Sequence, residues 1–115
     1  MIRLYGIANC DTVKKARAWF AEQGAEILFH DYKKSGVPQA ELDAWIAAHG
    51  WEPLVNRKGT TWRKLDEKTQ SAVVDAASAR ALMLAQPSVI KRPVVAWPDG
   101  GTTVGFDAAK FLERL

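Results

Sequence analysis

The order of hydrophobic and polar positions predicts two strands joined by a helix at the start of the chain. Residues 2–7 form a short apolar run typical of a buried strand, and the polar residues 8–12 indicate a strand-to-helix turn. A helix follows and ends near Gly24, and residues 26–32 form a second apolar strand. A right-handed crossover makes the two strands parallel. The apolar positions of the helix recur at helical spacing, at Val13, Ala16, Trp19 and Phe20.

The middle of the chain follows helical periodicity. Residues 38–50 are expected to form a helix that Pro38 opens and Gly50 closes. Residues 53–56 indicate a short helical turn, and the polar residues 57–61 indicate a loop. Residues 68–86 are expected to give one or two further helices. Their inward-facing side chains are expected to be Val73, Val74, Ala77, Leu82, Met83 and Leu84.

The last third returns to strands. Residues 93–97 and 102–105 are expected to pair as a hairpin around the turn at residues 98–101. Asp107 then caps a C-terminal helix. The whole order of elements predicts an α/β fold with a mixed four-stranded sheet, which is the thioredoxin arrangement carrying a helical insertion. The C-terminal helix is expected to turn three residues inward, Phe111, Leu112 and Leu115.

Composition narrows the possible functions. With 115 residues and 48% hydrophobic residues, the chain is expected to form one domain with an ordinary core. Its net charge of +3 is spread along the sequence, which disfavours direct nucleic-acid binding but permits a local anion pocket. A single cysteine excludes an intrachain disulfide and a CxxC pair. No signal-like or membrane-spanning segment is evident, so the cytoplasm is the expected location and no membrane partner is expected.

That single cysteine, Cys10, is the main candidate for chemistry. It ends the first strand and directly precedes a helix, where unpaired N–H groups and the helix dipole favour a thiolate. Lys14 and Lys15 add positive potential while Asp11 opposes it, and we expect the pKa of the thiol to lie below about 8.5. The alternative is a small, inert residue that closes the turn. The polar turn and the helix start favour the reactive thiol.

Two arginines are candidate anion-binding residues. In this topology Pro93 lies beside the N-terminus of the first helix, so Arg92 can reach the thiol, and we expect the Arg92–Pro93 bond to be cis. The alternatives are a surface cation at Arg92 and a trans proline that opens an edge strand. Arg57, in the inserted loop, is the other candidate for the same anion pocket.

Five stretches of the chain together carry a family resemblance. They are residues 5–16, 29–32, 54–65, 83–87 and 90–94. In this order they resemble the ArsC/Spx/MgsR family, thioredoxin-fold proteins related to glutaredoxin-coupled arsenate reductases, and in particular its YffB-type branch. The resemblance implies one ArsC-like domain over residues 1–115. Its thioredoxin-like core would span about 1–34 and 88–115, with the helical insertion at about 35–87.

The resemblance also implies roles for individual residues. It makes Cys10 the catalytic nucleophile and Arg57 and Arg92 the oxyanion-binding groups, with Thr12 and Lys14 as further candidate anion- or substrate-binding residues. The arsenate reductases carry a third arginine after the second hairpin strand, where this chain has Val104–Asp107. The loss of one charged hydrogen bond costs about 1.5–3 kcal/mol, which disfavours arsenate as the substrate.

A glutathione-linked thiol reductase acting on a disulfide or mixed disulfide is therefore the expected function. Glutathione is the expected co-substrate and glutaredoxin a possible partner, with no tightly bound cofactor and no metal. One alternative is arsenate reduction coupled to glutathione and glutaredoxin. The other is an Spx-like regulator that binds the RNA polymerase alpha subunit, although Val13 occupies the place of the second cysteine in the redox switch of those relatives.

Overall fold

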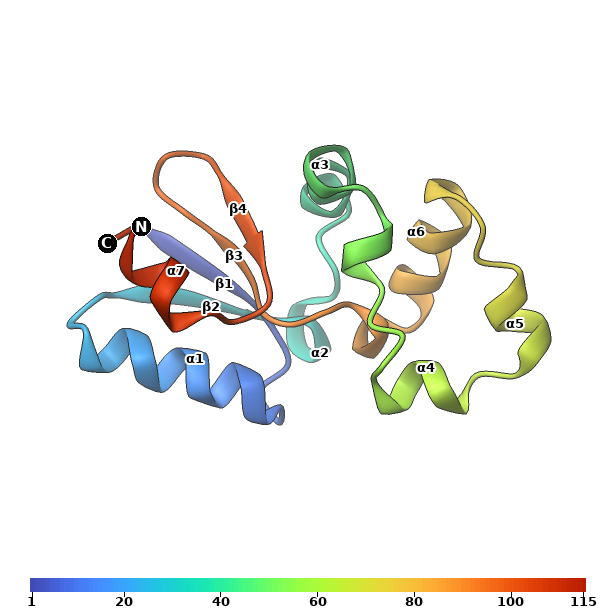
Figure 1. Cartoon of the computed structure of the whole chain (residues 1–115), viewed down its shortest axis with the longest axis horizontal. Helices are drawn as coiled ribbons and strands as arrows, with labels where there is room; N and C mark the ends of the chain where they lie inside the picture. Colours follow the sequence, from blue (N-terminus) through green and yellow to red (C-terminus); the bar gives the residue numbers. More distant parts are fainter. The chain divides into compact units, whose positions relative to one another are not determined.

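A computed structural model describes residues 1–115, and the chain divides into two compact units (Figure 1). The first unit is formed by Met1–Ser35 and Arg92–Leu115, and the second by Gly36–Lys91. None of the helices has the length and apolar character that would be needed to cross a membrane.

The first unit holds a four-stranded mixed sheet with the strand order β2-β1-β3-β4. β1 pairs parallel with β2 and antiparallel with β3, and β3 pairs antiparallel with β4. The mixed sheet predicted from the sequence is therefore confirmed, including its parallel pair. In chain order the elements are β1 (Ile2–Gly6), α1 (Asp11–Glu22), β2 (Ile27–Asp31), α2 (Tyr32–Ser35), β3 (Val94–Ala96), β4 (Thr102–Val104) and α7 (Ala108–Leu112).

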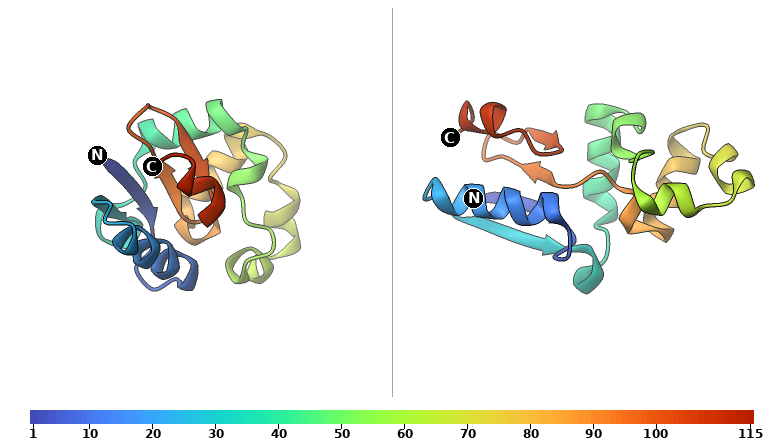
Figure 2. Two further views of the ribbon diagram at one scale, coloured as in Figure 1. Left: turned by 60° about the vertical axis from the view of Figure 1, so that its left-hand side comes forward. Right: turned by 60° about the horizontal axis from the view of Figure 1, so that its bottom comes forward.

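The core of this unit lies between the sheet and the two helices α1 and α7, which pack on the same face (Figures 1 and 2). Strand register places Leu4 opposite both Phe29 and Val95 on that face. The ring of Phe111 in α7 lies 5.1 Å from Trp97 and 5.6 Å from Phe20, centroid to centroid. The buried members of this core are Ile2, Leu4, Val13, Ala16, Phe20, Val95, Trp97 and Phe111.

The second unit is built from helices. An isolated β-bridge joins Val55 to Ile90, and the Arg80 Nε lies 2.6 Å from the Asp43 Oδ1, which links the helix that carries Arg80 to the one that carries Asp43. The elements of this unit are α3 (Gln39–His49), the 3-10 helix η1 (Glu52–Leu54), α4 (Thr60–Lys64), α5 (Glu67–Ser71), α6 (Ala76–Ala85) and the 3-10 helix η2 (Pro87–Val89).

Three details of the second unit differ from the sequence prediction. The predicted loop at residues 57–61 ends early, because Gly59 serves as the N-cap of α4. Val74 is 70% exposed, since it lies between α5 and α6 where no helical phase applies. Ala77 is also exposed, in the first turn of α6.

Two details of the first unit differ as well. Tyr32 opens α2 instead of ending the second strand. Leu112 and Leu115 are 58% and 52% exposed, so the prediction that they face inward was wrong. α7 is only five residues long, and a helix of this length presents a single large side chain, that of Phe111, to the core.

Candidate functional site

Cys10 lies in the loop between β1 and α1 and is the N-cap residue of α1. Its backbone is extended (φ −143°, ψ 124°), and its carbonyl oxygen accepts a hydrogen bond from the Lys14 N–H at 2.9 Å. The thiol is half-buried and packs against the core of the first unit. The sulfur thus lies at the first turn of a helix, where backbone N–H groups lack intrahelical partners.

Gly6, the last residue of β1, allows the neighbouring elements to approach closely at this point. A Cβ placed on Gly6 would lie 2.8 Å from the Cγ2 of Val13, a separation that real side chains do not tolerate, and 3.9 Å from the Cβ of Arg92. The absence of a side chain here therefore lets the first turn of α1 approach the end of β1, beside Arg92.

The strand β3 delivers Arg92 to the same place. Val94 pairs with Tyr5 near the end of β1, and Pro93 before it is buried. The Arg92–Pro93 peptide bond is cis, which is the isomer expected from the sequence. The guanidinium acts on the Cys10 sulfur both as a hydrogen-bond donor and as a positive charge. The structure thus brings Cys10, Arg92 and Pro93 together.

These surroundings favour the thiolate form of Cys10. Burial raises the pKa of the thiol, but the Val13 N–H, the Arg92 guanidinium and the Thr12 N–H lower it more, so the pKa lies below its ordinary value. A lowered pKa increases the fraction of thiolate, which is the nucleophilic form of cysteine.

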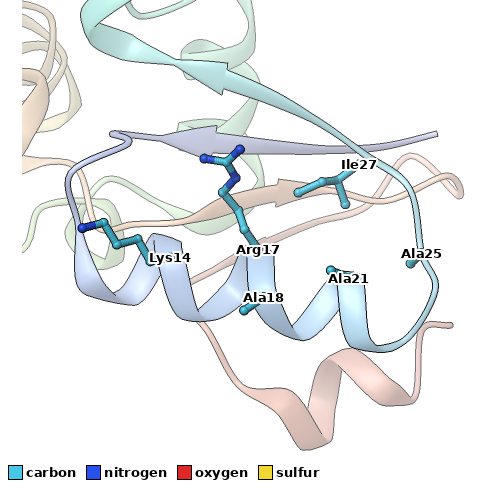
Figure 3. A pocket seen from close by; sticks show the side chains of 6 residues that line it. All are labelled: Lys14, Arg17, Ala18, Ala21, Ala25 and Ile27. Atoms are coloured by element: carbon cyan, nitrogen blue, oxygen red, sulfur yellow. The ribbon is translucent and has the colours of Figure 1, made fainter.

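Thr12 and Lys14 take different places around the thiol. Thr12 contributes its backbone N–H, while its side chain is exposed. Lys14 extends into a groove along α1 that Arg17 also lines (Figure 3). Lys14 and Lys15 are not among the groups that lower the pKa of Cys10, so the positive charge expected from them comes instead from Arg92.

Arg57 belongs to the second unit. It is exposed, and its guanidinium carbon lies 5.6 Å from the ring of Trp51 and 5.7 Å from that of Trp62. Both contacts are in the range of cation–π interactions, which restrict the orientation of the arginine. The convergence of Arg57 on the anion pocket of Cys10 stays a prediction.

Tyr32 is a residue of this region that sequence reasoning missed. Its side chain is almost fully buried, and its hydroxyl oxygen has no hydrogen-bond partner. Burial raises the pKa of Tyr32 strongly, against the charge of Arg92, which lowers it. Its ring lies 6.1 Å from His30, whose ring is 5.2 Å from that of Tyr5. The aromatic pattern at residues 29–32 is visible in the sequence, but the proximity to Arg92 depends on the fold.

A family model described as the ArsC family matches residues 5–114 of the chain. Among solved structures, a protein designated YFFB is 50% identical, with a TM-score of 0.93 over 100% of this chain and 99% of that one. An arsenate reductase (ArsC) related protein from Brucella melitensis is 53% identical, with a TM-score of 0.76 over 97% of this chain and 92% of that one.

A curated relative has a regulatory name. The global transcriptional regulator Spx of Streptococcus pyogenes serotype M6 is 25% identical over 101 residues, which cover 83% of this chain and 71% of that protein. The likeness to YFFB extends over the whole chain, and the family match covers nearly all of it, from the end of β1 to α7. The chain belongs to the ArsC family.

Proposed function

We propose that this protein is a thiol-dependent reductase that uses Cys10 as its nucleophile and takes electrons from glutathione. The observation that carries the proposal is a half-buried thiol whose pKa is lowered by Arg92 and by the first turn of α1. Reductase chemistry also agrees with the family and with the arsenate reductase related protein of Brucella melitensis.

The proposed cycle uses one cysteine. The Cys10 thiolate attacks one sulfur of a substrate disulfide, the S–S bond breaks, and the departing thiolate takes up a proton. Cys10 then holds the other half of the substrate as a mixed disulfide. The chain has no second cysteine to release it, so a glutathione thiolate attacks the substrate sulfur of this bond, which regenerates the Cys10 thiolate. The substrate half leaves as a mixed disulfide with glutathione, which a second glutathione reduces to the substrate thiol and glutathione disulfide. When the substrate is itself a mixed disulfide with glutathione, the overall products are the substrate thiol and glutathione disulfide.

Arg92 has two tasks in this proposal. It stabilises the Cys10 thiolate before attack, and it offers further N–H donors to a carboxylate of glutathione or of the substrate. Arg57 and Thr12 are proposed to bind other oxygens of the same ligand, with Lys14 as an additional cation.

The formation of an adduct tests the proposal. The protein is incubated with glutathione disulfide and its intact mass is measured, with Cys10→Ser as the control. We expect one glutathione on the wild type and none on the control, and we expect added glutathione, with or without glutaredoxin, to remove it. A folded wild-type protein that forms no adduct contradicts the proposal.

Arsenate reduction is the second candidate, because the name of the Brucella melitensis relative refers to it. The segment Val104–Asp107 contains no arginine, so an oxyanion would be held by fewer charged groups than in the arsenate reductases. Turnover of arsenate in the presence of glutathione and glutaredoxin would favour this candidate over disulfide reduction.

A regulatory role is the remaining alternative, and the likeness to Spx is the reason to test it. Val13 stands in α1 where those regulators have a second cysteine, and its side chain is fully buried. This position therefore has no redox chemistry. Absence of the glutathione adduct, together with retention on immobilised RNA polymerase alpha subunit, would favour the regulator.

A further inference from the structure

A groove runs along α1 on the side of β2 (Figure 3). It has a volume of about 450 Å³. Alanine methyl groups and one isoleucine form an apolar floor, and two cations lie at one end. The residues that line the groove are Lys14, Arg17, Ala18, Ala21, Ala25 and Ile27.

The two cations have no acidic partner. Neither Lys14 nor Arg17 forms an ion pair, and no acidic residue lines the groove. The guanidinium carbon of Arg17 lies 4.3 Å from the centroid of the Phe29 ring, so the aromatic face holds the arginine in place while its N–H groups stay available. The end of the groove at Lys14 and Arg17 is therefore suited to a carboxylate.

The strand beside the groove, β2, lies at an edge of the sheet. β2 is an outer strand of the sheet, with β1 as its only strand neighbour. It contains neither Lys nor Pro, the residues that commonly block edge pairing. Such an edge offers backbone N–H and C=O groups to an extended peptide.

The groove begins about one helical turn along α1 from the nucleophile. The backbone N–H of Lys14 donates a hydrogen bond to the carbonyl oxygen of Cys10, so the cationic end of the groove is one helical turn from Cys10. From Lys14 to Ala21 the helix rises about 10 Å, and Ala25 and Ile27 carry the groove further. This length accommodates three or more residues of extended chain at about 3.3 Å each.

We propose that this groove binds an extended acidic segment of a polypeptide substrate, whose disulfide is thereby presented to Cys10. The inference rests on the proposed function and specifies its substrate class. In the reaction, the Cys10 thiolate attacks the glutathione sulfur of a peptide–glutathione disulfide and the peptide leaves as a thiol. A second glutathione then releases the first as glutathione disulfide.

Free glutathione fits the groove less well than a polypeptide does. The tripeptide has no large apolar side chain for the floor formed by the alanines and Ile27, and it has few backbone amides to pair with β2. An acidic polypeptide segment uses all three features, because its carboxylates meet Lys14 and Arg17, its side chains cover the floor, and its backbone follows the edge.

A binding experiment tests the proposal without the chemistry of Cys10. Cys10→Ser protein is titrated with a fluorescent six-residue peptide that carries three Glu and a Ser in place of the reactive cysteine, and with a version in which Gln replaces Glu. We expect the acidic peptide to bind about five- to tenfold tighter at low salt, with an advantage that shrinks as salt rises. Arg17→Gln should remove most of this advantage. Lys15→Gln, an exposed cation of the same helix outside the groove, should not.

Amide chemical shifts locate the bound peptide. We expect the largest changes at residues 14–31, in α1 and β2. Equal binding of the two peptides, equal effects of Arg17→Gln and Lys15→Gln, or shift changes confined to other elements would overturn the proposal. Displacement of the peptide by equimolar glutathione would also overturn it. Peptide binding to Cys10→Ser is measured independently of the glutathione adduct on the wild type. Failure of the peptide-binding proposal can therefore be distinguished from failure of the proposed reductase function.

Discussion

The lowered pKa of Cys10 links the chemistry of one residue to the stability of the whole protein. A thiolate that is stabilised in the folded state contributes to the free energy of unfolding most fully above the pKa of an unfolded cysteine, about 8.5. This contribution is lost as the pH falls through the lower pKa of the folded protein. We therefore expect the stability difference between wild type and Cys10→Ser to shift in favour of the wild type as pH rises through this window. Urea unfolding at a series of pH values measures it, and a flat difference would contradict the lowered pKa.

The hydroxyl of Tyr32 gives a second prediction at a single residue. It is buried without a hydrogen-bond partner, and an unpaired polar group costs about 1–3 kcal/mol. We expect Tyr32→Phe, which keeps the ring beside His30, to leave the free energy of unfolding unchanged or to raise it by up to about 1 kcal/mol. Tyr32→Ala should instead cost about 3–5 kcal/mol because it empties the site of the ring. Urea denaturation distinguishes them, and a clear loss of stability in Tyr32→Phe would reveal a partner for the hydroxyl.

Among the elements, the junction of β1 with α1 determines the properties of the site. Gly6→Ala would place a methyl group 2.8 Å from the Cγ2 of Val13 and push the first turn of α1 away. We expect a loss of about 1–3 kcal/mol in stability and a rise in the pKa of Cys10, because the Val13 and Thr12 amides then move from the sulfur. Thiolate absorbance as a function of pH measures the second effect.

The other end of α1 supplies the matched control. Gly24 has φ +68°, so Gly24→Ala is strained by its backbone, yet no atom crowds a Cβ there. It should lower stability while leaving the pKa of Cys10 as it is in the wild type. An equal pKa change in both variants would mean that general loosening of α1, and not the displacement of its first turn, affects the thiol.

The accuracy of prediction from sequence also varies with the element. Position at a strand-to-helix turn is local, so the N-cap place of Cys10 could be predicted from its neighbours. The side of a helix that faces the core can be predicted only when the apolar pattern extends over several turns. The prediction of an inward side chain was therefore wrong for Leu112, in a five-residue helix, and for Val74, between two helices. The electrostatic role expected of Lys14 failed for a different reason, since the side chain that reaches the sulfur comes from Arg92, far along the chain.

At the scale of the whole molecule, the order of elements along the chain predicts how the strands pair. It does not predict which distant side chains the sheet brings close together. The parallel crossover and the hairpin follow from general rules of connection, and the structure has both. The burial of Tyr32 beside Arg92 requires the ends of β2 and β3 to be brought together by β1 between them. No local sequence pattern predicts this proximity, because residues 36–91 lie between Tyr32 and Arg92 in the chain.

Substitution of Arg92, in the first unit, and of Arg57, in the second, tests whether residues of both units take part in one reaction. Arg92 acts on Cys10 directly, so Arg92→Gln should raise the pKa of the thiol and also raise the KM for glutathione by about tenfold, the value of one charged hydrogen bond. Arg57 is not among the groups that shift the thiol, so Arg57→Gln should raise the KM similarly and leave the pKa unchanged. Lys58→Gln, the adjacent exposed cation, is the control for a general loss of charge. If Arg57→Gln behaves like Lys58→Gln, then Arg57 contributes through its contacts with Trp51 and Trp62 alone, and the anion is held by the first unit without it.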